Sequence, residues 1–196
     1  SLSLASVGAV SQATTSSAAS GSTTATVPAL KVAGASVINT VSPATPAGQA
    51  VTLANATNHF GGLVTVSGSQ VSIRDSNALT VQIAGSGASS VSAGGALQVA
   101  GAISGATGNL ALTSTGAMCL GALSVGGTLT LTSGAAVEQD PAMLTDAAAS
   151  LKVTGASVIN ASGQAVSLSN AANDFTGAVT VNAASLSLRD ANALQI

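Results

Sequence analysis

Short runs of alternating apolar and polar residues recur along the whole chain. The run at residues 51–53 (VTL) is followed by a similar run at residues 71–73 (VSI), and residues 166–168 (VSL) are followed at the same spacing by residues 186–188 (LSL). An apolar residue at every second position predicts a short strand with one buried face. The segments between the runs are rich in Gly, Asn, Ser and Ala, which favour turns.

The spacing of these runs predicts an all-β fold. Further apolar-polar-apolar runs begin at Leu30, Val64, Leu79, Leu97, Leu110, Leu129 and Leu151. Strands that recur about every 20 residues, with shorter ones between them, indicate a parallel β-helix (β-solenoid) with about 20 residues and three short strands per rung. Its connections are expected to be right-handed. We expect these residues to point inward: Leu53, Ile73, Leu131, Val153, Leu168 and Leu188.

An antiparallel sandwich is the alternative fold. It favours aromatic core residues and hairpin turns built from Asn-Gly or Asp-Gly. The chain contains neither dipeptide, and its aromatic residues are only Phe60 and Phe175. The narrow interior of a β-helix requires small side chains, so the composition favours the β-helix.

A second, longer repeat lies over the first. LKVAGASVIN at residues 30–39 recurs as LKVTGASVIN at residues 151–160, an offset of 121. Most of residues 1–83 is matched by residues 128–196, with intervening rungs at 84–127. We therefore expect residues 1–196 to be a single β-helix segment, an excerpt of a longer tandem array. A repeat of this length would hold about six rungs and lengthen the fibre by roughly 29 Å.

Four short polar residues occupy equivalent places after buried strand residues. Asn55 and Asp75 stand at the same position in successive predicted rungs, and Asn170 and Asp190 repeat the arrangement in the second copy. Side chains of this kind at a turn accept hydrogen bonds from neighbouring backbone N–H groups. We predict that the four form a structural turn ladder, within reach of the backbone of their own or the adjacent rung.

Charge and hydropathy exclude several classes of partner. Only 5% of the residues are charged, whereas about 25% is usual. The net charge of −2 offers no basic field for a phosphate backbone, so nucleic acid is not an expected partner. Ser, Thr and Gly interrupt every apolar stretch, so we expect no membrane span in this segment.

The few residues with reactive side chains lack the partners that catalysis or metal binding requires. His59 is the single histidine, and its counterpart in the second copy is Asp174, so we interpret it as an exposed loop residue. Cys119, the single cysteine, follows Met118 with no neighbouring cation, which indicates a small buried or half-buried thiol. We predict no catalytic, cofactor-binding or metal-binding residue and no cofactor.

The acidic cluster and the two phenylalanines have structural interpretations as well. Glu138, Asp140 and Asp146 would match the paired carboxylates of sugar-cleaving β-helices only with a groove and aromatic platforms, so we interpret them as a solvated turn. Phe60 and Phe175 recur in the pattern Asn-x-Phe-x-Gly. We interpret them as plugs where a loop folds over the core.

Three stretches resemble a known family. LSNAANDFTGAVTVNAASLSLRDANAL at residues 168–194, GGTLTLTSGAAVEQ at residues 126–139 and GGALQVAGAIS at residues 94–104 resemble the repeats of filamentous haemagglutinin-like bacterial surface adhesins. Those proteins are two-partner secretion exoproteins or autotransporter passengers. The resemblance implies a right-handed β-helix, export from a Gram-negative bacterium, and a secreted or cell-surface location.

The leading functional hypothesis is a non-enzymatic structural stalk segment of a secreted or surface-anchored fibrous adhesin. Its partner would be a host, cell-surface or matrix ligand, with possible self-association. A self-assembling extracellular filament or sheath protein is the alternative. Two minor alternatives are a surface that binds ice or another crystal through Thr and Ser columns, and a polysaccharide-active β-helix enzyme.

Overall fold

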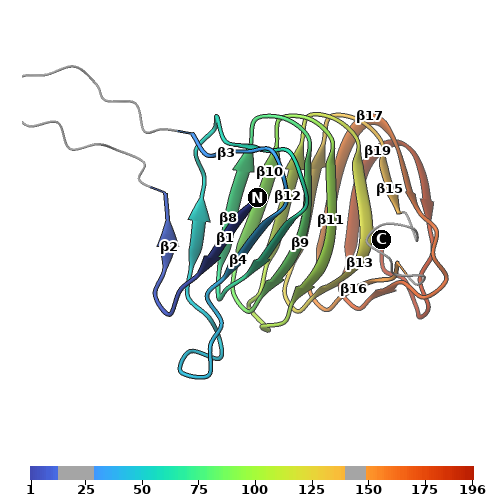
Figure 1. Cartoon of the computed structure of the whole chain (residues 1–196). Helices are drawn as coiled ribbons and strands as arrows, with labels where there is room; N and C mark the ends of the chain where they lie inside the picture. The colour runs from blue at the N-terminus through green and yellow to red at the C-terminus, as the bar shows by residue number, and fades with distance from the viewer. Residues whose placement is uncertain (13–28, 140–148) are drawn as a thin grey trace, which may run out of the picture.

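The computed structural model describes residues 1–12, 29–139 and 149–196. In this part of the chain nineteen strands and no helix are present, and every pairing between the strands is parallel. The strands coil around one axis and pile up as successive rungs (Figure 1). The predicted parallel β-helix is therefore confirmed.

The strands are β1 (Leu2–Ala5), β2 (Val10–Ser11), β3 (Lys31–Val32), β4 (Ser36–Asn39), β5 (Val51–Leu53), β6 (His59–Phe60), β7 (Val64–Ser67), β8 (Val71–Asp75), β9 (Leu79–Gly85), β10 (Ser89–Ala93), β11 (Leu97–Ile103), β12 (Leu110–Ser114), β13 (Met118–Val125), β14 (Leu129–Ser133), β15 (Val137–Gln139), β16 (Leu151–Val153), β17 (Ser157–Leu168), β18 (Asp174–Phe175) and β19 (Val179–Leu188).

The strands form three stacks that run along the fibre. Stack I contains β1, β4, β7, the second halves of β9, β11 and β13, and then β16 and β18. Stack II contains β2, β5, β8, β10, β12, β14 and the first halves of β17 and β19. Stack III contains the first halves of β9, β11 and β13, then β15 and the second halves of β17 and β19. The short strands β3 and β6 pair separately.

The interior consists of columns of apolar side chains. Burial alternates along the strands, as in β12 and β14, because every second side chain points into the coil. Five of the six residues predicted to point inward are buried, and Leu188 is half-buried against the same core. The prediction of inward columns is therefore confirmed.

The rungs in the middle of the chain have the expected length. Along stack II the strands begin at Val51, Val71, Ser89, Leu110 and Leu129, at intervals of 18 to 21 residues. The intervals from the start of β2 to the start of β5 and from the start of β14 to the start of β17 are longer, at 41 and 28 residues. The predicted rung length is thus the rule between β5 and β14.

From β8 onward, the links at the corner that follows stack II are short. Links of three residues join β8 to β9, β10 to β11, β12 to β13 and β14 to β15. The N–H of Gly94 donates to the carbonyl of Asp75 in the rung before, at 2.9 Å. A Cβ atom added at Gly94 would collide with the carbonyl oxygen of Ser76, so glycine is required for this close approach.

The second copy of the long repeat is turned by one stack relative to the first. The counterparts of β1, β4 and β7 in stack I are β14 and the first halves of β17 and β19 in stack II. From β1, five steps along stack I lead to β13, and β14 follows on the next face. One repeat therefore spans five and a third rungs, which corresponds to about 26 Å along the fibre. The sequence had predicted about six rungs and about 29 Å.

Candidate functional site

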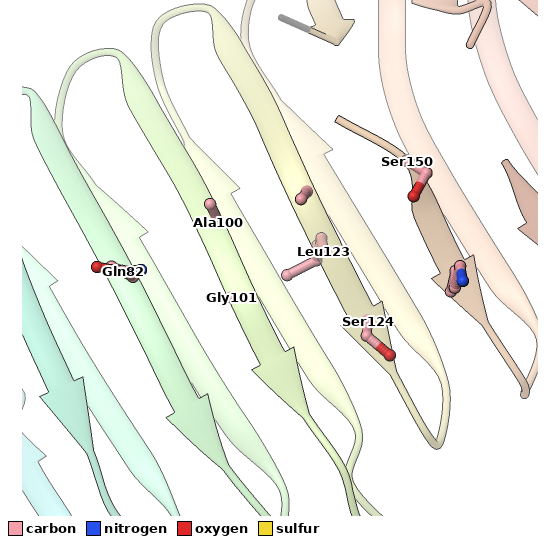
Figure 2. A pocket seen from close by; sticks show the side chains of 8 residues that line it. Gln82, Ala100, Gly101, Leu123, Ser124 and Ser150 are labelled. Carbon is pink, nitrogen blue, oxygen red and sulfur yellow. The ribbon is translucent and has the colours of Figure 1, made fainter. Parts of the chain in front are cut away.

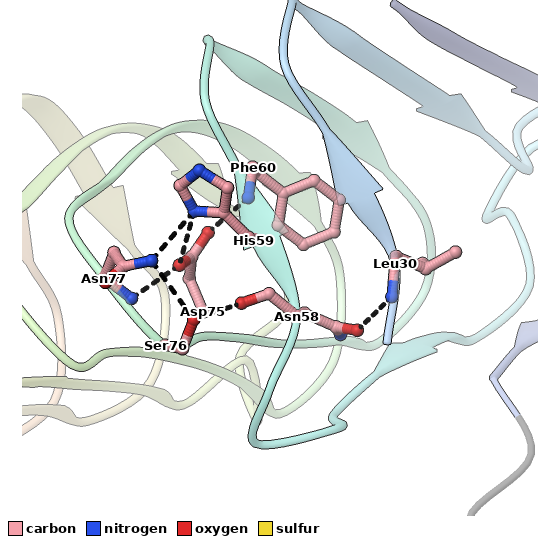
Figure 3. Close-up of polar contacts among 7 residues, drawn as sticks. All are labelled: Leu30, Asn58, His59, Phe60, Asp75, Ser76 and Asn77. Carbon is pink, nitrogen blue, oxygen red and sulfur yellow. Dashed lines mark hydrogen bonds and ion pairs between the residues drawn. The ribbon is translucent and has the colours of Figure 1, made fainter. Parts of the chain in front are cut away.

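A group of hydrogen-bonded polar side chains lies at the corner between β8 and β9 (Figure 3). Asp75 ends β8, and its carboxylate is fully buried. Its Oδ2 accepts a hydrogen bond from the N–H of Phe60 in the rung before at 2.7 Å, and its Oδ1 accepts one from the N–H of Asn77 at 2.7 Å. Asp75 therefore ties its own turn to the adjacent rung.

The second copy repeats this contact with a more exposed side chain. Oδ1 of Asp190 accepts hydrogen bonds from the N–H of Phe175 at 3.0 Å and from the N–H of Ala191 at 3.1 Å. Oδ2 of Asp190 is buried without a hydrogen-bond partner among the described residues. Both carboxylates thus hold the backbone of the rung before, but they divide the bonds differently between their two oxygens.

The two asparagines of the predicted ladder close their own turns. Oδ1 of Asn55 accepts hydrogen bonds from the N–H of Thr57 at 2.9 Å and from the hydroxyl of Thr57 at 2.8 Å. Oδ1 of Asn170 accepts a hydrogen bond from the N–H of Ala172 at 2.9 Å. Both kinds of residue therefore hold their own turns, and the two aspartates also bind the backbone of the rung before.

Two buried asparagines, one in each copy of the repeat, were not identified from the sequence. Asn58 and Asn173 are fully buried, and each forms a reciprocal amide pair with a glutamine, Gln12 and Gln139 respectively. Gln12 and Asn58 of the first copy recur as Gln139 and Asn173 in the second copy, and this recurrence is the signal that could have identified them. Proximity was not visible in the sequence, because 46 residues separate Gln12 from Asn58.

His59 lies in strand β6, so its interpretation as a loop residue was wrong. The His59 side chain is 46% exposed, and its Nδ1 lies 4.0 Å from Oδ1 of Asp75. The side-chain nitrogen Nδ2 of Asn77 lies 2.9 Å from the same Nδ1. The nearby hydroxyl of Ser76 donates to the carbonyl of Asn58 at 2.8 Å. In the second copy the amide of Asn192 donates to Asp174, which replaces the histidine, at 3.1 Å. The contact recurs without an imidazole, as expected for a structural role.

The cysteine, the acidic residues and the two phenylalanines singled out from the sequence do not lie together in one site. Cys119 is half-buried on β13 and is aligned in register with the exposed Glu138 of β15. Asp140 and Asp146 lie outside the described residues. Phe60 and Phe175 are each 2% exposed and belong to the core, in the short strands β6 and β18 rather than in a loop. No cluster of three potential metal ligands is found among residues 1–12, 29–139 and 149–196.

A shallow hollow of about 250 Å³ lies on the outer face over β9, β11, β13 and β16 (Figure 2). It surrounds a bulge at which the register between β11 and β13 shifts, next to Gly101 with its φ of 132°. Its lining residues are Gln82, Ala100, Gly101, Ala122, Leu123, Ser124, Ser150 and Lys152. These residues provide one cation, one amide and two hydroxyls beside Ala, Gly and Leu, so the lining of the hollow is mixed polar and apolar.

Comparison with known proteins identifies a repeat family. No curated protein and no solved structure matches the chain. In the described part of the chain, no helix is long and apolar enough to cross a membrane. A family model described as "Repeats of unknown function (DUF5649)" matches residues 1–67 and 107–182, which together make up more than half of the chain. The first segment lies in the first copy of the long repeat, and the second covers most of the second copy. The chain therefore belongs to this family of repeats.

Proposed function

We propose that the chain is a non-enzymatic structural stalk segment of a secreted or surface-anchored bacterial fibrous adhesin. The observation that carries this proposal is the unbroken ladder of parallel strands along stack II, from β2 to β19. Each inner rung of the ladder is hydrogen-bonded to the rungs before and after it. Such a stack is stiff, and it grows in length with every repeat.

The chemistry of the polar corners supports the same proposal. The carboxylates of Asp75 and Asp190 bind backbone N–H groups, and the amides of Asn58 and Asn173 bind backbone and glutamine groups. These side chains therefore stabilise the stack. A stalk requires reach and stiffness, and both follow from contacts of this kind.

The outer surface is consistent with a fibre that stays soluble with little charge. Most residues of the outward row of stack II carry a hydroxyl, and the row also contains Ala111 and the exposed Val158. The hydroxyl residues include Ser72, Ser90, Thr130 and Thr180, of which the last three are exposed. Ser72 and Ser90 bond to each other along the row at 3.3 Å. Hydroxyl groups hydrate the sheet without charge, and the resemblance to adhesin repeats suggests export to the cell surface.

Electron microscopy of a deletion series in the parent protein tests the proposal. Deleting residues 1–127, one full repeat, is expected to shorten the fibre by about 26 Å and to leave adhesion mediated by other parts of the protein intact. A fibre whose length does not depend on the number of repeats would contradict the proposal, as would adhesion that is lost with any single copy. Lengthwise stacking of the purified chain would favour the filament or sheath alternative instead.

A further inference from the structure

In each copy of the long repeat, one corner of the β-helix contains links of very different lengths. The link from β2 to β3 runs from position 12 to position 30, whereas the next link at that corner, from β5 to β6, runs only from 54 to 58. In the second copy, the link from β15 to β16 runs from 140 to 150, and the link from β17 to β18 runs from 169 to 173. In each copy a long link is thus followed, one rung later, by a short link of constant length.

The short link holds both ends of the long link through one side chain. Oδ1 of Asn58 accepts hydrogen bonds from the N–H of Leu30, at the end of the long link, and from Nε2 of Gln12, at its start, both at 2.9 Å. Nδ2 of Asn58 donates to Oε1 of Gln12 at 2.8 Å and to the carbonyl of Leu53 at 3.0 Å. Asn58 therefore joins the two ends of the long link to each other and to the rung above.

The second copy repeats all four bonds. Oδ1 of Asn173 accepts hydrogen bonds from the N–H of Leu151 at 2.9 Å and from Nε2 of Gln139 at 2.7 Å. Nδ2 of Asn173 donates to Oε1 of Gln139 at 3.1 Å and to the carbonyl of Leu168 at 3.0 Å. Nε2 of Gln139 also donates to the carbonyl of Ala149, which precedes the returning strand β16.

The buried amides are fully satisfied at both corners. An asparagine side chain has two N–H donors and an oxygen with two lone pairs, and each asparagine uses all four. A buried amide with four bonds fixes the positions of the groups around it, because losing any bond would leave an unpaired group away from water. The same geometry occurs around the longer link of the first copy and the shorter link of the second, so it does not depend on the length of the link.

We propose that the Gln–Asn pair is a clamp that makes this corner an insertion point of the β-helix, where the length and sequence of the connecting chain can vary without loss of stacking. Once the ends of a link are fixed, the free energy of closing it rises only slowly with its length. The proposal concerns the fold and holds whether or not the parent protein is an adhesin.

The corner that holds the clamp of the first copy offers a matched control farther along the fibre. The link from β10 to β11 has three residues (94–96), and Gly94 packs against the backbone of Ser76 too closely to admit even a Cβ atom. A longer connection there would disturb this backbone contact. The proposal therefore predicts a large difference between an insertion in the link from β2 to β3 and the same insertion in the link from β10 to β11.

The first experiment inserts the same Gly/Ser peptide, about 12 residues long, at two sites in the 196-residue chain, between residues 20 and 21 or between Gly94 and Gly95. We expect the first insertion to lower the melting temperature by less than about 3 °C. The second insertion is expected to lower it by more than about 10 °C or to abolish cooperative unfolding, because it separates stacked corners. Equal tolerance of the two insertions would overturn the proposal.

The second experiment tests the clamp itself by hydrogen exchange. Asn173→Ala removes the acceptor of the Leu151 N–H, so exchange of that amide should accelerate at least tenfold, while the Leu30 amide in the intact first copy should not change. If this variant does not fold, Gln139→Ala is the milder test, read at the amide of Asn170, which donates to Oε1 of Gln139 at 3.3 Å. Unchanged exchange of the amide that lost its acceptor would overturn the role of the clamp.

Discussion

Replacing Asp75 by asparagine should lower the free energy of unfolding much more than the same change at the equivalent Asp190. Asp75 uses both carboxylate oxygens, one for the N–H of Phe60 and one for the N–H of Asn77. Asp190 uses only Oδ1, which accepts both of its bonds, while Oδ2 has no partner among the described residues. Asparagine keeps one acceptor oxygen and replaces the other with an NH₂ group. Asparagine at position 190 can therefore keep both bonds, whereas asparagine at position 75 must place a donor against a backbone N–H.

The magnitude follows from these contacts. A hydrogen bond to a charged group contributes about 1.5–3 kcal/mol, and a buried donor without a partner costs about 1–3 kcal/mol. Because Asp75 is fully buried, water cannot replace the lost acceptor. We expect Asp75→Asn to lower the free energy of unfolding by about 2.5 kcal/mol, which for a chain of this size corresponds to roughly 5–10 °C in melting temperature. We expect Asp190→Asn to change the free energy of unfolding by less than about 0.5 kcal/mol.

The assay is thermal and urea unfolding of the two variants and the parent chain, followed by circular dichroism. Hydrogen exchange adds a local measurement, because only Asp75→Asn should expose the amide of Phe60 or Asn77 to exchange. A difference of less than about 0.5 kcal/mol between the free energies of unfolding of the two variants would refute the role of the second carboxylate oxygen of Asp75.

Two further predictions concern the interior and the corners. Ser157→Ala should raise the free energy of unfolding by about 1 kcal/mol, because the Ser157 hydroxyl is buried between the Leu129 and Val179 positions without a partner among the described residues. Ser114→Ala is the control and should destabilise, since Oγ of Ser114 donates to the carbonyl of Gly116 at 2.8 Å; a loss of stability in both variants would show that the Ser157 hydroxyl is bonded in solution. Gly94→Ala should cost more than about 2 kcal/mol, because the new Cβ meets the Ser76 carbonyl, whereas Gly8→Ala has no atom nearer than 3.8 Å and should be almost neutral. Comparable melting temperatures for the two glycine variants would argue against tight stacking at the corner.

The sequence by itself was sufficient to predict the strands, the buried columns and the rung length. Apolar residues at alternate positions, as at residues 71–73 and 129–131, can bury one face only in an extended strand, and this requirement is local. The positions of Asn55 and Asp75 at turns were also visible, because short polar residues after a buried strand favour turns wherever the strand lies.

Only the tertiary structure decided how the rungs are aligned with one another. The number of rungs in a repeat depends on how the strands are divided among the stacks. β9 and β11 each continue from stack III into stack I as one strand, whereas β15 and β16 are separate strands. The alternating pattern marks each strand but not the stack to which the strand belongs, so the rotation of the second copy by one stack was not predictable. The contacts of Asn58 with Gln12 and Leu30 have the same origin, because residues far apart in the chain meet only when successive rungs are stacked in register.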